Sequence, residues 1–222
     1  MRILDKVFNK KTNFKAGGLI LEDIPFSATY VKTPDKFVAP KKLDFRDMCI
    51  ETSDQATTPH CVGYATAGYL EVQNWRVKHY PEQIDGDAIY NESKKLDGYN
   101  GEGTYARFAV MAAKNLGLTN GAPEYVNNDR QKFKFAIHEN LVCIGSFSIT
   151  NEWDYVGKDG IIPNWKNNII RTGGHAVLCC GFDDFGVYLQ NSWSFDWGLY
   201  GFATLSWEQF DRQFQHGIII RN

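Results

Sequence analysis

The most informative stretch of the sequence is Asn191-Ser192-Trp193-Ser194-Phe195-Asp196-Trp197-Gly198-Leu199-Tyr200-Gly201-Phe202. It carries two tryptophans, three other aromatic residues and two glycines around a single amide side chain. A plain hairpin does not need this density of aromatic side chains, because its turn is specified by residues such as glycine, asparagine and aspartate. The stretch is therefore the first candidate for a functional segment.

Short apolar or alternating runs lie on both sides of this stretch. They are separated by Gly, Asp and Asn residues, which favour turns. The runs lie at residues 141–144, 175–181, 187–189, 200–205 and 217–220. Strands of this length tend to pair with their neighbours in sequence, so we expect this half of the chain to form an antiparallel sheet.

The preceding half has a helical texture. Three segments avoid proline and have a length typical of helices, at residues 62–79, 86–96 and 105–116. A helical half followed by a strand-rich half predicts an α+β fold of two lobes, with a cleft between them as a favoured binding site. We expect the helical lobe at about 55–135 and the β lobe at about 140–222.

Residues 1–42 differ from both halves. Glycine and proline recur there in irregular order, at Gly17-Gly18, Pro25, Pro34 and Pro40. Breakers at such spacing do not suit a helix or a central strand. We therefore expect an extended N-terminal arm rather than a domain.

A helix start lies directly before one of the five cysteines. Thr58 can serve as the N-cap and Pro59 as the first helical residue, where its missing N–H costs nothing. Cys61 would then lie in the first turn, where unpaired N–H groups and the helix dipole favour an anion. The sequence thus predicts a stabilised thiolate at Cys61, with N–H groups beside it that could hold an oxyanion.

A reactive thiol needs a base, and the base usually lies far away in the sequence. His175 has the best setting among the five histidines, because it follows Gly173-Gly174 and opens an apolar run. His60 adjoins the cysteine, and we expect it to be an exposed polar residue. The remaining three lie among charged or polar residues, at His79, His138 and His216.

Together these residues resemble the papain-like cysteine proteases, with short bacterial and phage-type members as the nearest match. Residues 191–202 are similar to that family's Asn-Ser-Trp-Gly, Trp-Gly and Gly-Tyr block. The other matches occur in the same order as in the family, at Leu43-Asp44-Phe45-Arg46, Asp54-Gln55 and Gly174-His175-Ala176-Val177. The resemblance implies a catalytic domain over residues 43–222, with a helical lobe, an antiparallel β-barrel-like lobe and an active site in the cleft between them.

The resemblance also implies a role for each matching residue. Cys61 would be the nucleophile, His175 the general base and acid, and Asn191 the residue that orients the imidazole. Gln55 would donate to the oxyanion together with the backbone N–H of Cys61. The same motifs place further residues at the substrate, namely Gly174, Ala176 and Trp193, with Trp193 also covering the bond between histidine and asparagine. The implied reaction needs no cofactor and no metal.

The sequence departs from the family around the nucleophile. The family's Cys-Gly-Ser-Cys-Trp is replaced by Thr58-Pro59-His60-Cys61-Val62, so its half-cystine and its tryptophan are missing, and Ser194 replaces a glycine. Asn100-Gly101-Glu102-Gly103 resembles the glycine-rich loop that pairs with substrate backbone, although it could equally form a simple turn. Gly101 and Gly103 are therefore further candidates for substrate binding.

Charge and hydropathy exclude several classes of protein. The chain has 24 Lys+Arg against 26 Asp+Glu among 222 residues, a net charge of −2, and it has no dense basic run that would follow a nucleic acid. Its most apolar windows, such as residues 176–182, fall far short of the roughly 18 residues that a membrane span needs. The N-terminus lacks the apolar core of a signal peptide. We expect no nucleic-acid or membrane partner and an intracellular, cytoplasmic location.

The cysteines fit this expectation. Five is an odd number, and no Cys-x-x-Cys pair occurs, so neither a disulfide scaffold nor a zinc ribbon is indicated. A metal site at His175, Cys179 and Cys180 is disfavoured, because Cys179 shares a strand face with His175 whereas Cys180 points to the other face. A chain without a disulfide framework suits a reducing compartment.

Three functions stay open at this point. The first is a thiol endopeptidase acting on peptide or protein substrates through a thioester acyl-enzyme. The second is an amidase or acyltransferase with the same Cys-His-Asn residues but another substrate, such as cell-wall peptide. The third is a catalytically silent binding protein on a protease scaffold. The N-terminal arm could lie across the cleft and inhibit the enzyme, or simply pack on the surface.

Overall fold

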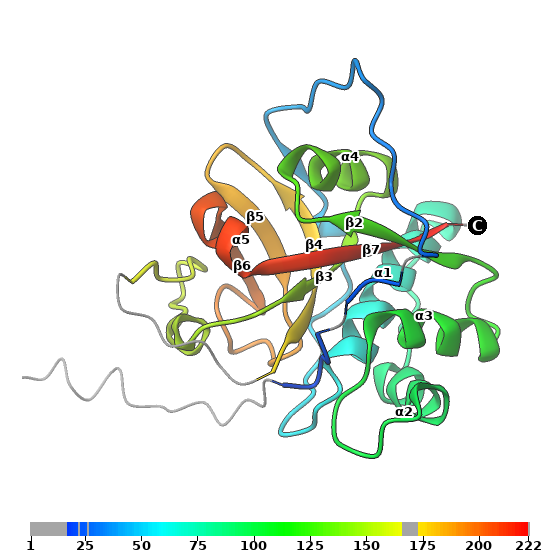
Figure 1. Cartoon of the computed structure of the whole chain (residues 1–222). Helices are drawn as coiled ribbons and strands as arrows, with labels where there is room; N and C mark the ends of the chain where they lie inside the picture. The colour runs from blue at the N-terminus through cyan, green and yellow to red at the C-terminus, as the bar shows by residue number, and fades with distance from the viewer. Residues whose placement is uncertain (1–16, 22, 26, 166–172, 222) are drawn as a thin grey trace, which may run out of the picture.

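The computed structural model describes residues 17–165 and 173–221, apart from residues 22 and 26. Three helices gather on one side of the molecule (Figure 1), namely α1 (Cys61–Lys78), α2 (Gly86–Asp97) and α3 (Ala106–Asn115). Their bounds lie within one residue, at each end, of the proline-free segments 62–79, 86–96 and 105–116. The helical half is therefore confirmed.

Helix α1 lies at the centre of the molecule and is buried for most of its length, from Cys61 to Val72. A helix that is apolar on all sides must be covered on all sides, and α2, α3 and the sheet surround it. Two glycines allow the close approach. A Cβ at Gly63 would lie 2.1 Å from the Gly86 carbonyl oxygen, and one at Gly68 would lie 3.2 Å from the Leu178 side chain.

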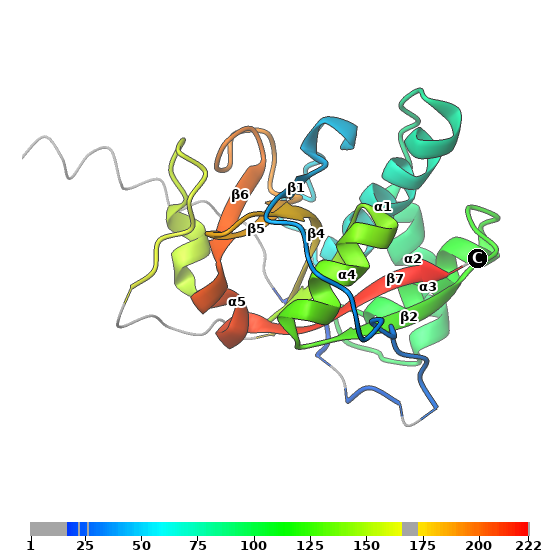
Figure 2. The ribbon, with the colours of Figure 1, turned by 90° about the horizontal axis from the view of Figure 1, so that it is seen from above.

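The other half of the described chain is one antiparallel sheet with the strand order β2-β7-β3-β4-β5-β6, with β1 paired to β4. The strands are β1 (Leu43–Asp44), β2 (Ala122–Asn127), β3 (Cys143–Phe147), β4 (His175–Phe182), β5 (Gly186–Gln190), β6 (Phe202–Ser206) and β7 (Phe214–Arg221). Each of the five expected runs forms a strand. Figure 2 shows strands β5 and β6 at one side of the molecule and helices α1–α3 at the other.

The sheet is open, so the expectation of a barrel-like lobe is corrected. Its two end strands, β2 and β6, do not pair with each other in the described chain. The edge of β2 is instead covered by the N-terminal arm, where Val31 N–H donates to the Tyr125 carbonyl at 2.9 Å and Tyr125 N–H donates to the Thr29 carbonyl at 2.8 Å. Because the arm pairs with backbone N–H and C=O groups at the edge of β2, this edge is protected without closure of the sheet into a barrel.

Two helices and two strands were not predicted from the sequence, namely α4, α5, β1 and β2. Helix α4 (Arg130–Asn140) packs against β2, β3, β4 and β7, and α5 (Trp207–Gln213) packs against β5, β6 and β7. Strand β2 pairs with β7 along its whole length. Residues 122–140, which the sequence predicts at the end of the helical lobe, therefore pack with the sheet.

The junction of the two lobes places the ends of α1 and β4 side by side. Strand β4 is buried at every residue and packs against α1. The Cys61 thiol lies within hydrogen-bonding reach of the Ala176 N–H. The first residues of the two elements, Cys61 and His175, are thereby held at the same end of the interface.

The described part of the arm passes between the lobes before it reaches β2. Leu19 forms a parallel bridge with Thr104 on the helical side and an antiparallel bridge with Gly174 on the β side. Its side chain is 1% exposed. The described residues between 17 and 42 form no helix and none of the seven strands, and residues 1–16 of the expected arm lie outside the described part. None of the helices described here is both long enough and apolar enough to span a bilayer.

Candidate active site

Cys61 is the first residue of α1 and is fully buried. The helix begins two residues later than the sequence predicts, with His60 rather than Thr58 as its N-cap. The reason is local, because the Thr58 hydroxyl donates to the Gln55 carbonyl at 2.6 Å and closes a turn over residues 55–58. The shift keeps Cys61 in the first turn, where backbone N–H groups lack helical partners.

His175 and Asn191 form a hydrogen-bonded pair, and His175 directly precedes Ala176, whose N–H contacts the Cys61 sulfur. His175 Nε2 lies 2.8 Å from Asn191 Oδ1, and both residues are buried. Because the amide oxygen only accepts, Nε2 is the protonated nitrogen, which leaves Nδ1 as the basic nitrogen of the neutral ring. Asn191 Oδ1 also accepts from the Ser192 N–H at 2.8 Å, which fixes the orientation of the amide.

A wall of tryptophans encloses the imidazole. The Trp193 ring lies 4.7 Å from the His175 ring at a 34° tilt, and the Trp153 ring meets it edge-on at 6.0 Å. Trp197 stacks on Trp153 at 6.2 Å. Trp153 and Trp193 are fully buried, so the ring of Trp193 shields the histidine from water and presents no surface to a substrate in this arrangement.

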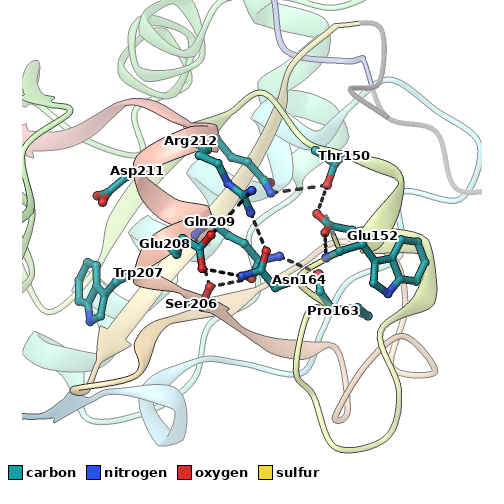
Figure 3. A network of polar contacts seen from close by, with 12 residues as sticks. Thr150, Glu152, Pro163, Asn164, Ser206, Trp207, Glu208, Gln209, Asp211 and Arg212 are labelled. Atoms are coloured by element: carbon teal, nitrogen blue, oxygen red, sulfur yellow. Dashed lines mark hydrogen bonds and ion pairs between the residues drawn. The ribbon is translucent and has the colours of Figure 1, made fainter. Parts of the chain in front are cut away.

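A polar network on α5 holds the segment that carries Trp153 (Figure 3). Trp153 Nε1 donates to Gln213 Oε1 at 2.8 Å. Thr150 donates to the buried carboxylate of Glu152 at 2.5 Å, and Glu152 also accepts from the Trp165 N–H. Gln209 Nε2 donates to the Pro163 carbonyl at 2.7 Å. Residues 150–165 are thus anchored to α5 rather than left to aromatic packing alone.

Gln55 is 1% exposed and is held on both sides of its amide. Its Oε1 accepts from the Ser192 hydroxyl at 2.6 Å, and its Nε2 donates to the Thr58 carbonyl at 2.7 Å. The Gln55 N–H also donates to the Ser192 carbonyl at 2.9 Å. These bonds join the turn before Cys61 to the segment after Asn191, and they direct the donor end of Gln55 toward the start of α1.

Of the two glycines of the glycine-rich loop, Gly103 lies against the arm, whereas Gly101 packs against a side chain of its own loop. Gly103 has a φ of +84°, and a Cβ there would lie 3.0 Å from the Gly18 carbonyl oxygen of the arm. Gly101 lies under the Tyr99 ring, since a Cβ would come within 2.6 Å of it. The backbone bonds to the arm come from the next residue, Thr104, whose N–H donates to the Gly18 carbonyl at 3.0 Å.

On the opposite wall, Gly174 makes the corresponding backbone contacts. Its N–H donates to the Leu19 carbonyl at 3.0 Å, and its carbonyl accepts from the N–H groups of Gly17 at 3.1 Å and Leu19 at 3.3 Å. Ala176 is buried on β4 and offers its N–H to the Cys61 sulfur. Thr104 and Gly174 therefore bind one extended chain between them.

That chain covers the thiol. A Cβ at Gly18 would lie 3.0 Å from Cys61 Sγ and 2.1 Å from the Pro59 carbonyl oxygen, so only glycine fits at this point. Burial raises the pKa of Cys61 to about 12, although N–H groups of Ala176, Val62 and Gly18 act to lower it. The lowered pKa expected from the helix start is not found under the arm, because desolvation outweighs the N–H donors. In this arrangement the thiol is protonated at neutral pH.

His60 differs from the sequence expectation as well. Its side chain is 17% exposed rather than fully solvated, and its Nδ1 lies 2.7 Å from the Asp87 carboxylate. Its ring stacks on Tyr90 with centroids 3.9 Å apart. His60 is therefore part of the contact between α1 and α2.

Two residues of the site had no signal in the sequence. Thr104 contributes only its backbone, which leaves no trace in residue type, although it directly follows the predicted Gly103. Trp153 lies 22 residues before His175 in a short 3-10 helix (Asn151–Tyr155), and only the fold brings the two rings together. All five cysteines are described, and all are free thiols. The described residues contain no cluster of three metal-ligating side chains.

The structure is similar to solved structures of cysteine proteases. Xylellain, a cysteine protease from Xylella fastidiosa, matches with a TM-score of 0.77 and 22% identity, covering 94% of this chain and 97% of that one. A procathepsin B from Trypanosoma congolense matches with a TM-score of 0.74 and 14% identity, over 97% and 89% of the two chains. The digestive procathepsin L2 of Tenebrio molitor larval midgut matches with a TM-score of 0.74 and 16% identity, over 100% and 83%.

These likenesses establish the fold. No family model matches the sequence, and no curated protein is significantly similar to it. The chain nevertheless has the papain-like cysteine protease fold, with an open antiparallel sheet as its β half.

Proposed function

We propose that the chain is a thiol endopeptidase that hydrolyses peptide bonds through a thioester acyl-enzyme. The observation that carries this proposal is the 2.8 Å bond between His175 Nε2 and Asn191 Oδ1, located beside a helix that begins with Cys61. A neutral amide fixes the imidazole without taking its proton, as a thiolate–imidazolium pair requires. The similarity of the fold to cysteine proteases supports the assignment.

In the first half of the reaction, His175 Nδ1 takes the thiol proton of Cys61 when a peptide replaces the arm. The thiolate attacks the carbonyl carbon, and the oxyanion accepts from the Cys61 N–H and the Gln55 Nε2. The intermediate collapses as the C–N bond breaks, and His175 gives its proton to the departing amine. The products of this half are a free amine and a thioester on Cys61.

In the second half, water attacks the thioester. His175 accepts a proton from the water as its oxygen bonds to the carbonyl carbon. The C–S bond then breaks and the carboxylic acid leaves, and the proton held by His175 either moves to the sulfur or stays on the imidazole as the partner of the thiolate. The tryptophan wall keeps other water away from the His175–Asn191 bond, because Trp153 and Trp193 are fully buried.

Substitution of the nucleophile tests this function. We expect Cys61→Ala to abolish cleavage of a fluorogenic peptide while leaving the unfolding midpoint close to that of the parent chain. Cys143→Ala is the matched control, since Cys143 is also a buried free thiol but lies on β3 away from His175. Retention of cleavage by the Cys61→Ala variant would sink the proposal.

The arm inhibits the enzyme in this proposal. Residues 17–19 occupy the cleft between Thr104 and Gly174 and bury the thiol, and some of the similar structures are proenzymes. Leu19→Asp places a charge at a position that is 1% exposed, which should release the arm. We expect faster peptide cleavage, whereas Val38→Asp, at an arm residue that is 87% exposed, should change nothing. Equal rates in all three chains would remove the inhibitory role.

A further inference from the structure

The loop that binds the arm is held from behind by two side chains of α2. Lys94 Nζ makes three hydrogen bonds of 2.8 Å each, to Asp97 Oδ2, the Tyr99 carbonyl and the Gly103 carbonyl. An ammonium group has three donors, so all three are satisfied in this position. The Asp97 side chain is fully buried while that of Lys94 is 22% exposed, which makes this a shielded ion pair and not a surface contact.

Tyr90, one helical turn before Lys94, holds the other backbone group of the same glycine. Its hydroxyl accepts from the Gly103 N–H at 3.0 Å. Both the N–H and the carbonyl of Gly103 are thereby bonded to α2. The Gly103 carbonyl and the Thr104 N–H belong to one trans peptide group and point in opposite directions. With the carbonyl bonded to Lys94, the Thr104 N–H faces the arm and donates to the Gly18 carbonyl at 3.0 Å, and the Thr104 carbonyl accepts from Ile20 N–H at 2.9 Å.

The same tyrosine contacts the start of the nucleophile helix. Its ring stacks on His60 at 3.9 Å and 24°, and His60 is the N-cap residue directly before Cys61. His60 in turn is bonded to Asp87 of α2 at 2.7 Å. One face of α2 thus contacts both His60, which directly precedes Cys61, and Gly103, which directly precedes the peptide-binding Thr104.

The loop, which Asp97 of α2 also holds by accepting from the Tyr99 N–H at 2.8 Å, depends on such bonds for its order. It contains two glycines, Gly101 and Gly103, whose backbone freedom disfavours a single conformation. No disulfide restrains it, because all five cysteines of the chain are free. The polar bonds from α2 therefore have to supply the order that the loop needs before it can bind an extended chain.

We infer that Lys94 and Tyr90 are positioning residues that fix Thr104 at a set distance from Cys61 and so determine how tightly extended peptides bind. The inference rests on the proposed function. Neither residue touches the reacting atoms, since both act through Gly103. Loss of either side chain should therefore weaken the binding of long peptides and leave the chemical step unchanged. A ligand too short to reach Thr104 should bind the variants and the parent chain equally well.

Kinetics with substrates of two lengths test this inference. We expect Lys94→Met, introduced into the Leu19→Asp chain whose cleft is open, to raise the KM of a peptide with four residues before the scissile bond by about tenfold, because a charged donor and its bonds are lost. The kcat for that peptide, and kcat/KM for a single-residue ester, should stay within twofold of the values for Leu19→Asp alone. Tyr90→Phe should show a smaller change in the same direction. The matched control is Lys95→Met, which removes an exposed lysine bonded only to Glu92.

Hydrogen exchange on the intact, resting chain gives a second readout that needs no activity. Peptic fragments that cover Ile20 and Thr104 should exchange about tenfold faster in Lys94→Met and in Tyr90→Phe, and at the parent rate in Lys95→Met. A chain that cleaves no peptide but shows this pattern would refute the proposed function and retain the positioning role. Unchanged exchange, or an equal loss of kcat for both substrates together with a lower unfolding midpoint, would overturn the inference.

Discussion

The two walls of the cleft are built by different means. On the β side, His175 and Asn191 are buried and enclosed by Trp193, Trp153 and Trp197. On the helical side, Thr104 follows a glycine loop whose order comes from the polar bonds of Lys94 and Tyr90. Aromatic packing holds the His175–Asn191 pair, which must keep one geometry during the reaction. Hydrogen bonds hold the backbone of Thr104, which must bind and release an extended chain.

This difference predicts which measurement responds to a change on each wall. A substitution on the β side should alter kcat or the stability of the whole fold, because aromatic packing is continuous with the core. A substitution on the helical side should alter the affinity for extended chains with little effect on stability.

The largest effect is expected at the base. His175→Ala should lower kcat for a peptide by about a thousandfold, since general base catalysis contributes on the order of 10² to 10⁴. Steady-state kinetics on the Leu19→Asp background, where the cleft is open, measures it. Asn191→Ala should show a smaller loss of the same kind. A change in KM alone would place His175 in binding and contradict the division between the walls.

Trp153→Ala should destabilise the fold by about 3–5 kcal/mol, the usual cost of removing a buried aromatic side chain. The ring is fully buried, contacts His175 and Trp197, and is bonded to Gln213. Urea unfolding followed by fluorescence checks the loss. Trp165→Ala is the control, because that indole is 37% exposed. Equal, small losses for both variants would show that the tryptophan wall is not part of the core.

The β side should also be sensitive to acid through His216. This residue is 2% exposed, lies 3.2 Å from the Ser146 hydroxyl and packs on Tyr125. Burial lowers its pKa from 6.5 to about 4. As the pH falls below 6.5 the unfolded chain therefore binds a proton that the folded chain does not, and the free energy of unfolding decreases until the pH reaches about 4.

The decrease should amount to about 3 kcal/mol between pH 6.5 and 4, since each pKa unit corresponds to roughly 1.4 kcal/mol. Urea titrations at several pH values measure it, and His216→Gln should flatten the curve in this range. If the slope persists in that variant, other groups cause the acid sensitivity.

The smallest effect is expected at the start of α2. The Asp85 carboxylate caps this helix by accepting from the Ala88 N–H at 3.0 Å. Asp85→Ala should cost about 1 kcal/mol of stability, as is typical of a lost N-cap, and should leave kcat unchanged. Thermal unfolding and peptide kinetics check the two parts. A fall in kcat would mean that the helical side takes part in the chemistry after all.

Much of this arrangement could be predicted from the sequence, because local signals specify it. The helices α1, α2 and α3 begin and end within one residue of the proline-free segments 62–79, 86–96 and 105–116, because a long helical run is a local signal. Helix α4 was not predicted, although Asp129 caps it by accepting from the Lys132 N–H at 2.9 Å. Its Lys132-Phe133-Lys134-Phe135 run alternates like a strand, and only the burial of Phe133, Ala136 and Ile137 reveals the helical face.

The candidate site likewise has residues that the sequence predicts and features that it does not. The side chains of Cys61, His175, Asn191 and Gln55 carry their chemistry in the residue type and can be found by order and spacing. The helix start was misplaced because the Thr58 hydroxyl closes a turn with Gln55 instead of capping α1. The raised pKa of Cys61 could not be predicted either, because it results from burial under the arm. The arm residue that contacts the thiol, Gly18, lies 43 residues before Cys61 in the sequence.

The central claim is that Cys61 is the catalytic thiol and that the arm covers it. Alkylation with iodoacetamide, followed by peptide mapping and by the peptidase rate in the same samples, tests both parts directly. We expect slow labelling of Cys61 in the parent chain, and at least tenfold faster labelling in Leu19→Asp, with peptidase activity falling in proportion to the Cys61 label. Labelling of another cysteine in step with the loss of activity, or full activity in chains whose Cys61 is alkylated, would contradict the account.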